Sequence, residues 1–205
     1  MNAPRGLALG LLALCASACA SIGSEEEIPV LASARVTTDF ETYELRRVGL
    51  LPIDAPGDQL PDPALQASFF AELAGATDFE IVPLDPRDLE EVLTSEPYRR
   101  GRYSPHTIVE LSRRYNLDGL FFGTITDQKY YPPQRLGLSI DLVAAETGLV
   151  IWAGSVHLDA RDSTVRQALE SWNQREGEPD GAWEVALLSP HMFASFAAWQ
   201  VASLL

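Results

Sequence analysis

The sequence predicts an α/β protein built on a mixed sheet of about five strands, three parallel with helical crossovers and the rest an antiparallel meander. Helices are expected to pack on this sheet, including helices at the C-terminus. Three short apolar runs of the buried-strand type, at 48–53, 79–82 and 120–125, predict the parallel group. Helical spacing of apolar residues between these runs predicts the crossovers. Alternation of apolar and polar residues after the third run predicts the meander.

The segments between the first three strands are predicted to be helices. Leu65, Phe69 and Leu73 lie on one face of the first helix, and two shorter helices, around 89–93 and 108–115, form the second crossover. A capping side chain stands directly before proline at four predicted helix starts: Asp62-Pro63, Asp85-Pro86, Ser104-Pro105 and Ser189-Pro190. The side chain accepts an otherwise unpaired backbone N–H, and proline presets φ where its missing N–H is not needed.

The last two strands are predicted to form a hairpin. Residues 135–142 alternate between apolar and polar, and a turn at 146–148 returns the chain as a fifth strand at 149–158. Right-handed crossovers make the first three strands parallel, so the hairpin extends that sheet. Residues 183–205 are apolar almost all round, which predicts helices buried either in this domain or against another copy.

The first 18 residues have the order of an export signal. A basic residue precedes an apolar run at 6–14, and small residues follow before Cys19. The run is too short to span a membrane, which takes about 20 apolar residues. We therefore expect 1–18 to be a signal peptide, 19–45 to be a tether because it lacks periodicity, and 46–205 to be a single α/β domain outside the cytoplasm.

Ala16-Ser17-Ala18-Cys19 resembles the lipobox of bacterial lipoproteins, in which the cysteine is acylated and becomes the first residue. The resemblance implies a lipoprotein-type signal peptide and a lipid anchor, such as palmitate, on Cys19. Ser21 stands where many inner-membrane lipoproteins have aspartate, which implies the outer membrane rather than the inner one. Ordinary cleavage at an Ala-x-Ala site is the alternative. Without the leader, Cys19 is the only cysteine of the chain, so no intramolecular disulfide can form.

The charge of the chain excludes one class of partner. Its 205 residues include 29 acidic and 15 basic ones, a formal net charge of −14. Such a surface repels phosphate backbones, so we expect no nucleic-acid partner.

The sequence contains neither a Gly-rich phosphate loop nor a nucleophile elbow. The prediction is a protein that is not an enzyme and uses no cofactor.

Two groups of side chains at the ends of predicted strands are candidates for a ligand site and for a metal site. The loop from Asp54 to Asp62 follows the first strand, where open α/β sheets bind ligands, so a ligand-binding protein or an enzyme using this loop is the alternative function. Its aspartates lack the spacing of a calcium loop. His157 and Asp159 share one face of the fifth strand, as two metal ligands must, but no third ligand is evident, and we expect no metal.

Two loops carry the side chains expected to contact a partner, since Arg and Tyr are the residue types that dominate interfaces. The first loop contains Tyr98, Arg99, Arg100, Arg102 and Tyr103; the second contains Tyr130 and Tyr131, followed by two prolines. The second loop is predicted to form the tip of the hairpin between the third and fourth strands. Either loop would dock a partner protein or an anionic envelope polymer. The alternative is that these rings pack back onto the domain.

Three segments resemble a group of bacterial envelope lipoproteins. They are 47–53, 114–123 and 146–152, which match an opening strand, a helix followed by a strand with glycine, and an acid-x-Gly hairpin with tryptophan. The group includes the curli-secretion lipoprotein, lipoprotein activators of penicillin-binding proteins and neisserial-type surface lipoproteins. The resemblance covers 46–158 and implies a fold rather than a chemistry.

Members of this group are scaffolds. The resemblance therefore implies a membrane-anchored, non-catalytic binding or assembly module on the periplasmic side of the cell envelope. A homo-oligomeric subunit of a secretion assembly is the further alternative. A pore-forming version needs hairpins that cross a membrane, with about 9–11 residues in each strand. The loop at 127–134 is too short for such a hairpin, so we do not expect a pore.

Overall fold

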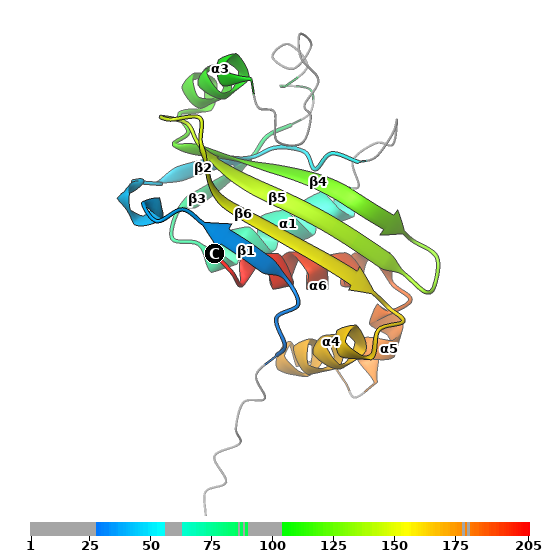
Figure 1. The fold of residues 1–205 in the computed structure, drawn as a ribbon. Coiled ribbons are helices and arrows are strands. Elements are labelled where there is room, and N and C mark those ends of the chain that lie inside the picture. The colour runs from blue at the N-terminus through cyan, green and yellow to red at the C-terminus, as the bar shows by residue number, and fades with distance from the viewer. Residues whose placement is uncertain are drawn as a thin grey trace, which may run out of the picture.

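A computed structural model of the chain describes residues 28–55, 63–85, 87, 89, 104–177, 179 and 181–205. In this part of the chain, six strands form one mixed sheet with the order β1-β6-β5-β4-β2-β3 (Figure 1). Helices pack on the sheet, and the last of them lies at the C-terminus. These features confirm the predicted α/β class.

The central strands follow the prediction. β2 (Arg47–Leu50) pairs in parallel with β3 (Glu80–Pro83) and with β4 (Gly119–Lys129), which gives the expected parallel group. β5 (Arg135–Ala144) and β6 (Val150–Asp159) then add the antiparallel meander. β4 is longer than the apolar run predicts because its second half continues to pair with β5.

One strand differs from the prediction. β1 (Ser33–Val36) lies within 19–45, the segment expected to be a tether, and pairs antiparallel with β6 at the edge of the sheet. A strand of four residues is too short to show a convincing two-residue periodicity. Ile28, which precedes β1, is also buried in the core. The packed part of the chain therefore starts well before residue 46.

Two long helices cover one face of the sheet. α1 (Pro63–Ala76) and α6 (Pro190–Ala202) lie side by side there (Figure 1), joined by a hydrogen bond of 2.9 Å between Ser68 Oγ and Ser195 Oγ. α6 is apolar on nearly all sides because α1, the sheet and α4 (Ser163–Arg175) surround it. α6 is thus buried within this domain, which is one of the two alternatives predicted for 183–205.

The predicted helix starts can be compared where they are described. Ser189 caps α6, since its Oγ accepts a hydrogen bond of 3.4 Å from a backbone N–H in the first turn. α3 (Pro105–Tyr115) begins at its proline as predicted, although the Ser104 side chain makes no capping hydrogen bond. Asp62 and most of the helix predicted around 89–93 lie outside the described residues.

Different helices pack on the two faces of the sheet. Alternate residues of β5 and β6, among them Leu138, Ile140 and Trp152, are buried under α1 and α6. On the opposite face, a second apolar cluster with Ile108 of α3 covers Leu120 at the end of the sheet near β2 and β3. No helix of the described part lies over the front of β6 and β1 (Figure 1).

The remaining elements are short. A 3-10 turn, η1 (Phe40–Thr42), precedes β2, and α5 (Ala182–Ala186) lies between α4 and α6. None of the helices in the described ranges combines the length and the apolar character that a membrane crossing requires.

A buried glutamine of α6 forms hydrogen bonds with the backbone of residues 29–32, just before β1. Gln200 has no exposed surface, and its Oε1 accepts hydrogen bonds from Leu31 N at 2.5 Å and Ala32 N at 3.4 Å. Its Nε2 donates to Pro29 O at 2.9 Å. These bonds pair backbone groups that lie just before β1, and buried backbone groups require such partners. The amide therefore determines where the chain enters the domain.

Replacing Gln200 with alanine should remove the hydrogen bonds that hold the residues before β1 and so destabilise the domain. A buried backbone group that loses its partner costs about 1–3 kcal/mol, so we expect the free energy of unfolding in urea to fall by about that amount. Gln167→Ala, on the exposed side of α4, is the matched control and should change this free energy by less than about 0.5 kcal/mol. Equal unfolding midpoints for the two variants would contradict the role of Gln200.

Candidate functional site

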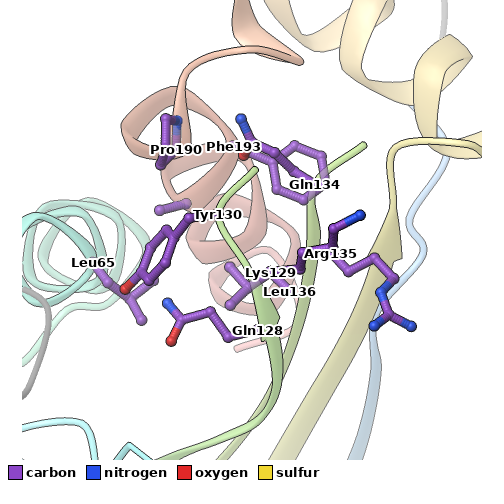
Figure 2. A pocket seen from close by; sticks show the side chains of 10 residues that line it. Leu65, Gln128, Lys129, Tyr130, Gln134, Arg135, Leu136, Pro190 and Phe193 are labelled. Carbon is purple, nitrogen blue, oxygen red and sulfur yellow. The ribbon is translucent and has the colours of Figure 1, made fainter. Parts of the chain in front are cut away.

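The β4–β5 hairpin presents two tyrosines at its tip. The strands pair from Gly119 and Ala144 to Lys129 and Arg135, so the loop between them is only 130–134. Tyr131 is 81% exposed, and Tyr130 is 41% exposed and lies beside Leu65 of α1 (Figure 2). The predicted position of both tyrosines at a hairpin tip is confirmed. Tyr131 does not pack back onto the domain.

The base of the hairpin is held on both sides. Asp127 Oδ2 and Arg135 Nη1 form an ion pair at 3.5 Å across the two strands. Gln134 is 2% exposed, and its carbonyl oxygen accepts a hydrogen bond of 2.9 Å from Ala160 N. A loop on such a base loses little further conformational freedom when a partner binds it, which favours Tyr131 as a contact residue.

A small cavity lies between the hairpin base and the start of α6 (Figure 2). It measures about 10 Å³, and its walls include Lys129, Tyr130 and Gln134 of the hairpin and Pro190 and Phe193 of α6. The Nε2 atom of Gln134 is buried there and has no hydrogen-bond partner in the described part of the chain. Nothing in the sequence predicts this cavity, because its two walls are far apart along the chain.

A row of hydroxyl side chains crosses the open face of the sheet. Thr124, Ser139, Ser155 and Ser33 stand opposite one another on β4, β5, β6 and β1, and the last two share a hydrogen bond of 3.2 Å between their Oγ atoms. An open hollow of about 350 Å³ is lined by the three serines of this row and by His157. The row can donate and accept hydrogen bonds. The sequence shows the separate hydroxyls, but only the strand register brings them together.

A wider hollow, of about 650 Å³, lies at the opposite end of the sheet from the hairpin tip. Glu44, Arg46 and Asp118 border it, and these charged groups already have partners in the protein. Arg46 Nη2 lies 2.9 Å from Glu44 Oε2, and Asp118 Oδ2 accepts hydrogen bonds from the backbone N–H groups of Arg46 and Arg47 at 2.9 and 3.0 Å. These three groups are therefore already paired and contribute little to the binding of a charged ligand in the hollow.

The loop predicted as an alternative ligand site is described only at Asp54 and Ala55. Asp54 N donates to Gly123 O at 2.9 Å, and Asp54 O accepts from Ile125 N at 2.8 Å, so this backbone extends the sheet. Burial raises the pKa of the Asp54 carboxyl, against the effect of a hydrogen bond from the Ala55 backbone. Residues 56–62 lie outside the described residues, so ligand binding by this loop stays a prediction.

The carboxylates that follow β6 have protein partners. Asp159 accepts hydrogen bonds from Arg161 Nη2 at 2.6 Å and Nε at 3.0 Å. Asp162 caps α4 by accepting a hydrogen bond of 2.8 Å from Thr164 N. His157 is exposed on the open face of the sheet. Within the described ranges, no three His, Cys, Asp or Glu side chains are grouped so that they could hold a metal ion.

The hydrogen bonds from the Arg161 side chain lower the pKa of the Asp159 carboxyl, with a further contribution from the Arg161 backbone N–H. A lowered pKa stabilises the folded state above the ordinary value of 3.8, and this contribution is lost as the pH falls through the folded-state value. In an NMR titration we expect the Asp159 carboxyl to remain ionised below pH 3.8. Arg161→Ala should move the midpoint back toward that pH, and an unchanged midpoint would contradict the pairing.

Some predicted functional residues cannot be compared with the structure. The basic aromatic loop, with Tyr98, Arg99, Arg100, Arg102 and Tyr103, lies outside the described residues, as does Cys19. Their roles in partner binding and lipidation stay predictions. The three histidines, His106, His157 and His191, are exposed and lie on α3, β6 and α6, so they do not belong to one element.

No protein family matches the sequence, and no curated protein is similar to it in sequence. Solved structures are similar to it in fold. The PelC dodecamer from Paraburkholderia phytofirmans is 12% identical, with a TM-score of 0.49 over 84% of this chain and 95% of that chain. Lipoprotein GNA1162 from Neisseria meningitidis is 17% identical, with a TM-score of 0.40 over 55% of this chain and 79% of that chain. The LpoB C-terminal domain from Salmonella enterica is 12% identical, with a TM-score of 0.39 over 56% and 84%.

GNA1162, which is called a lipoprotein, is thus among the solved structures of similar fold. At such low identities the likeness describes the fold alone, and one fold supports many functions. The function of this chain has to follow from its own residues and surface.

Proposed function

We propose that this chain is a lipoprotein held on the periplasmic side of a bacterial membrane through Cys19, where it acts as a non-catalytic binding or assembly module of the cell envelope. The observation that carries the proposal is the tip of the β4–β5 hairpin, where Tyr131 is 81% exposed above a buried and paired base. An exposed tyrosine on a fixed base is the kind of side chain that contributes most at protein interfaces.

The lipid anchor keeps the start of the folded domain within a short distance of the membrane. Nine residue steps separate Cys19 from the buried Ile28, and an extended chain covers at most about 3.5 Å per residue, or about 30 Å in all. A partner of the hairpin tip is therefore an envelope protein or polymer that is in the membrane or near its surface. Ser21 favours the outer membrane as the site of anchoring.

Site-specific photo-crosslinking in intact cells tests the docking role. A benzophenone side chain is introduced in place of Tyr131, and in place of Leu149 as the control. Leu149 is 60% exposed and lies next to the turn between β5 and β6, at the other end of the sheet. We expect a discrete crosslinked product in the membrane fraction from position 131 and none from position 149. The absence of a product at position 131, or the same products at both positions, would contradict the proposal.

A further inference from the structure

The open face of the sheet contains a buried hydroxyl group without a partner. Ser139 of β5 lies opposite Ser155 of β6, which in turn lies opposite Ser33 of β1, and all three line the hollow of about 350 Å³. Ser139 is 8% exposed, and its Oγ has no hydrogen-bond partner in the part of the chain that the structure describes. Nearly all buried hydroxyl groups are paired, so this one indicates a partner group from outside the chain.

Two further polar side chains approach one another beside this row. A Cβ atom at Gly137 would lie 2.6 Å from Thr126 Oγ1 and 3.1 Å from His157 Nδ1, so both side chains lie over the bare backbone of the glycine. The register of β4 shifts between Ile125 and Asp127, which places Thr126 in a β-bulge. Bulges and glycines inside strands are both frequent where a ligand approaches a sheet.

The charges around the hollow exclude an ionic ligand. Of the described residues that line it, His157 is the only one with a titratable side chain. The nearby carboxylates of Asp127 and Asp159 are paired with Arg135 at 3.5 Å and with Arg161 at 2.6 Å. An anion is also repelled by the net charge of −14. An ion in the hollow would therefore lose part of its hydration without gaining a fixed counter-charge.

An uncharged ligand with many hydroxyl groups fits the hollow. An apolar ligand would leave the Ser139 hydroxyl unpaired, and extended peptides pair with the edges of sheets rather than with their faces. Neighbouring strands are about 4.8 Å apart, so the serine hydroxyls recur at about that spacing in a line across the sheet. A glycan presents hydroxyl groups at regular intervals along its length, and each of them can donate and accept a hydrogen bond.

We propose that this face binds an uncharged glycan of the cell envelope, which lies across β5, β6 and β1 over Ser139, Ser155 and Ser33. Thr126 and His157 contact the same sugar chain from its side nearer the hairpin. The inference goes beyond the docking role of the hairpin tip, because none of these residues belongs to 130–134. The glycan and the partner of the tip are held by different surfaces of one domain.

An NMR titration of the full mature chain tests this assignment, in micelles of a detergent without a sugar headgroup. The uncharged probes are cellotetraose and chitotetraose, the charged one is the glucosamine tetramer with the same linkage, and glycerol is the control. We expect the backbone amides of Gly137 and Ser139 to shift saturably with an uncharged tetramer. A Kd of about 1 mM is expected, since about four hydrogen bonds of ordinary net strength give this affinity. Glycerol should cause no saturable shift.

Two variants connect the shift to the serine row. Ser139→Ala and Ser155→Ala each remove one hydroxyl group and should raise the Kd about fivefold. Ser171→Ala makes the same chemical change on α4, away from the open face, and should leave the Kd unchanged. Ser155 is exposed, so its variant gives a result even if Ser139→Ala does not fold.

The outcomes separate the possible occupants of this face. No saturable shift with either uncharged tetramer, a saturable shift with glycerol, or an unchanged Kd in the folded serine variants would overturn the glycan site. Tighter binding of the glucosamine tetramer than of both uncharged ones would overturn the uncharged ligand. A benzophenone at position 155 that gives a discrete crosslink to a protein in intact cells would assign the face to a protein instead.

The crosslink at position 131 is a separate result. Glycan binding without that crosslink would overturn docking at the hairpin tip and leave the glycan site standing. A crosslink at position 131 without glycan binding would overturn the glycan site alone.

Discussion

Gly154→Ala should lower the free energy of unfolding by about 2–4 kcal/mol, although it adds a single methyl group. A Cβ atom at this position would lie 2.4 Å from Cη2 of Trp152 and 2.9 Å from its Cζ2. The indole is 1% exposed, packs edge-to-face on Phe121 with 6.3 Å between ring centroids, and donates its Nε1–H to Leu204 O at 3.2 Å. It cannot move aside without losing these contacts.

Urea denaturation of Gly154→Ala beside Gly75→Ala measures this effect. Both variants make the same chemical change, but a Cβ atom at Gly75 meets nothing within 4 Å. Gly75 lies near the end of α1, where alanine favours the helix, so the control should be neutral or more stable by up to about 1 kcal/mol. Equal unfolding midpoints for the two variants would show that the Trp152 ring is not packed against Gly154.

The contact between Trp152 and Gly154 marks the limit of what the sequence predicts about the core. Alternation of residue types predicts a strand around Trp152 and which of its faces is buried. It does not predict that the indole lies over the residue two positions later. That arrangement depends on Phe121 and on the end of α6, which approach from distant parts of the chain.

The difference between local pattern and distant contacts also explains which strands could be predicted from the sequence. β2 and β4 follow from apolar runs, because a strand covered on both faces consists mainly of apolar residues, whereas β3 is an edge strand in which only Ile81 is buried. β1 was missed because its order depends on partners outside it: the backbone of β6 and the Gln200 amide that holds the residues before it. A tether and a short edge strand have similar compositions, so the sequence alone does not separate them.

The candidate site was predicted in part, for related reasons. Tyr130 and Tyr131 lie between two alternating segments, so their place at a hairpin tip is a local property of the sequence. The row of hydroxyls through Ser139 and Ser155 depends on strand register. The cavity at Gln134 depends on where α6 begins relative to the hairpin, and an unpaired amide becomes visible only when its surroundings are known.

Cys19→Ser should move the protein from the membrane fraction to the soluble periplasmic fraction. A serine cannot carry the thioether-linked lipid that the lipobox resemblance implies. Each methylene group buried in the bilayer contributes about 0.8 kcal/mol, so loss of the acyl groups removes most of the membrane affinity. Fractionation of cells and metabolic labelling with palmitate measure both consequences.

Cys15→Ser is the matched control for this prediction. It makes the same change four residues earlier, within the leader that is expected to be removed. It should leave the label and the membrane fraction unchanged. Loss of the label in both variants, or membrane retention of Cys19→Ser, would contradict an anchor on Cys19.

The intact mass of the protein extracted from membranes tests the central claim most directly, because it reports export, cleavage and lipidation together. We expect the mass of a chain that begins at Cys19, increased by the mass of its acyl groups. A mass that includes residues 1–18, or that equals an unmodified polypeptide, would contradict the account.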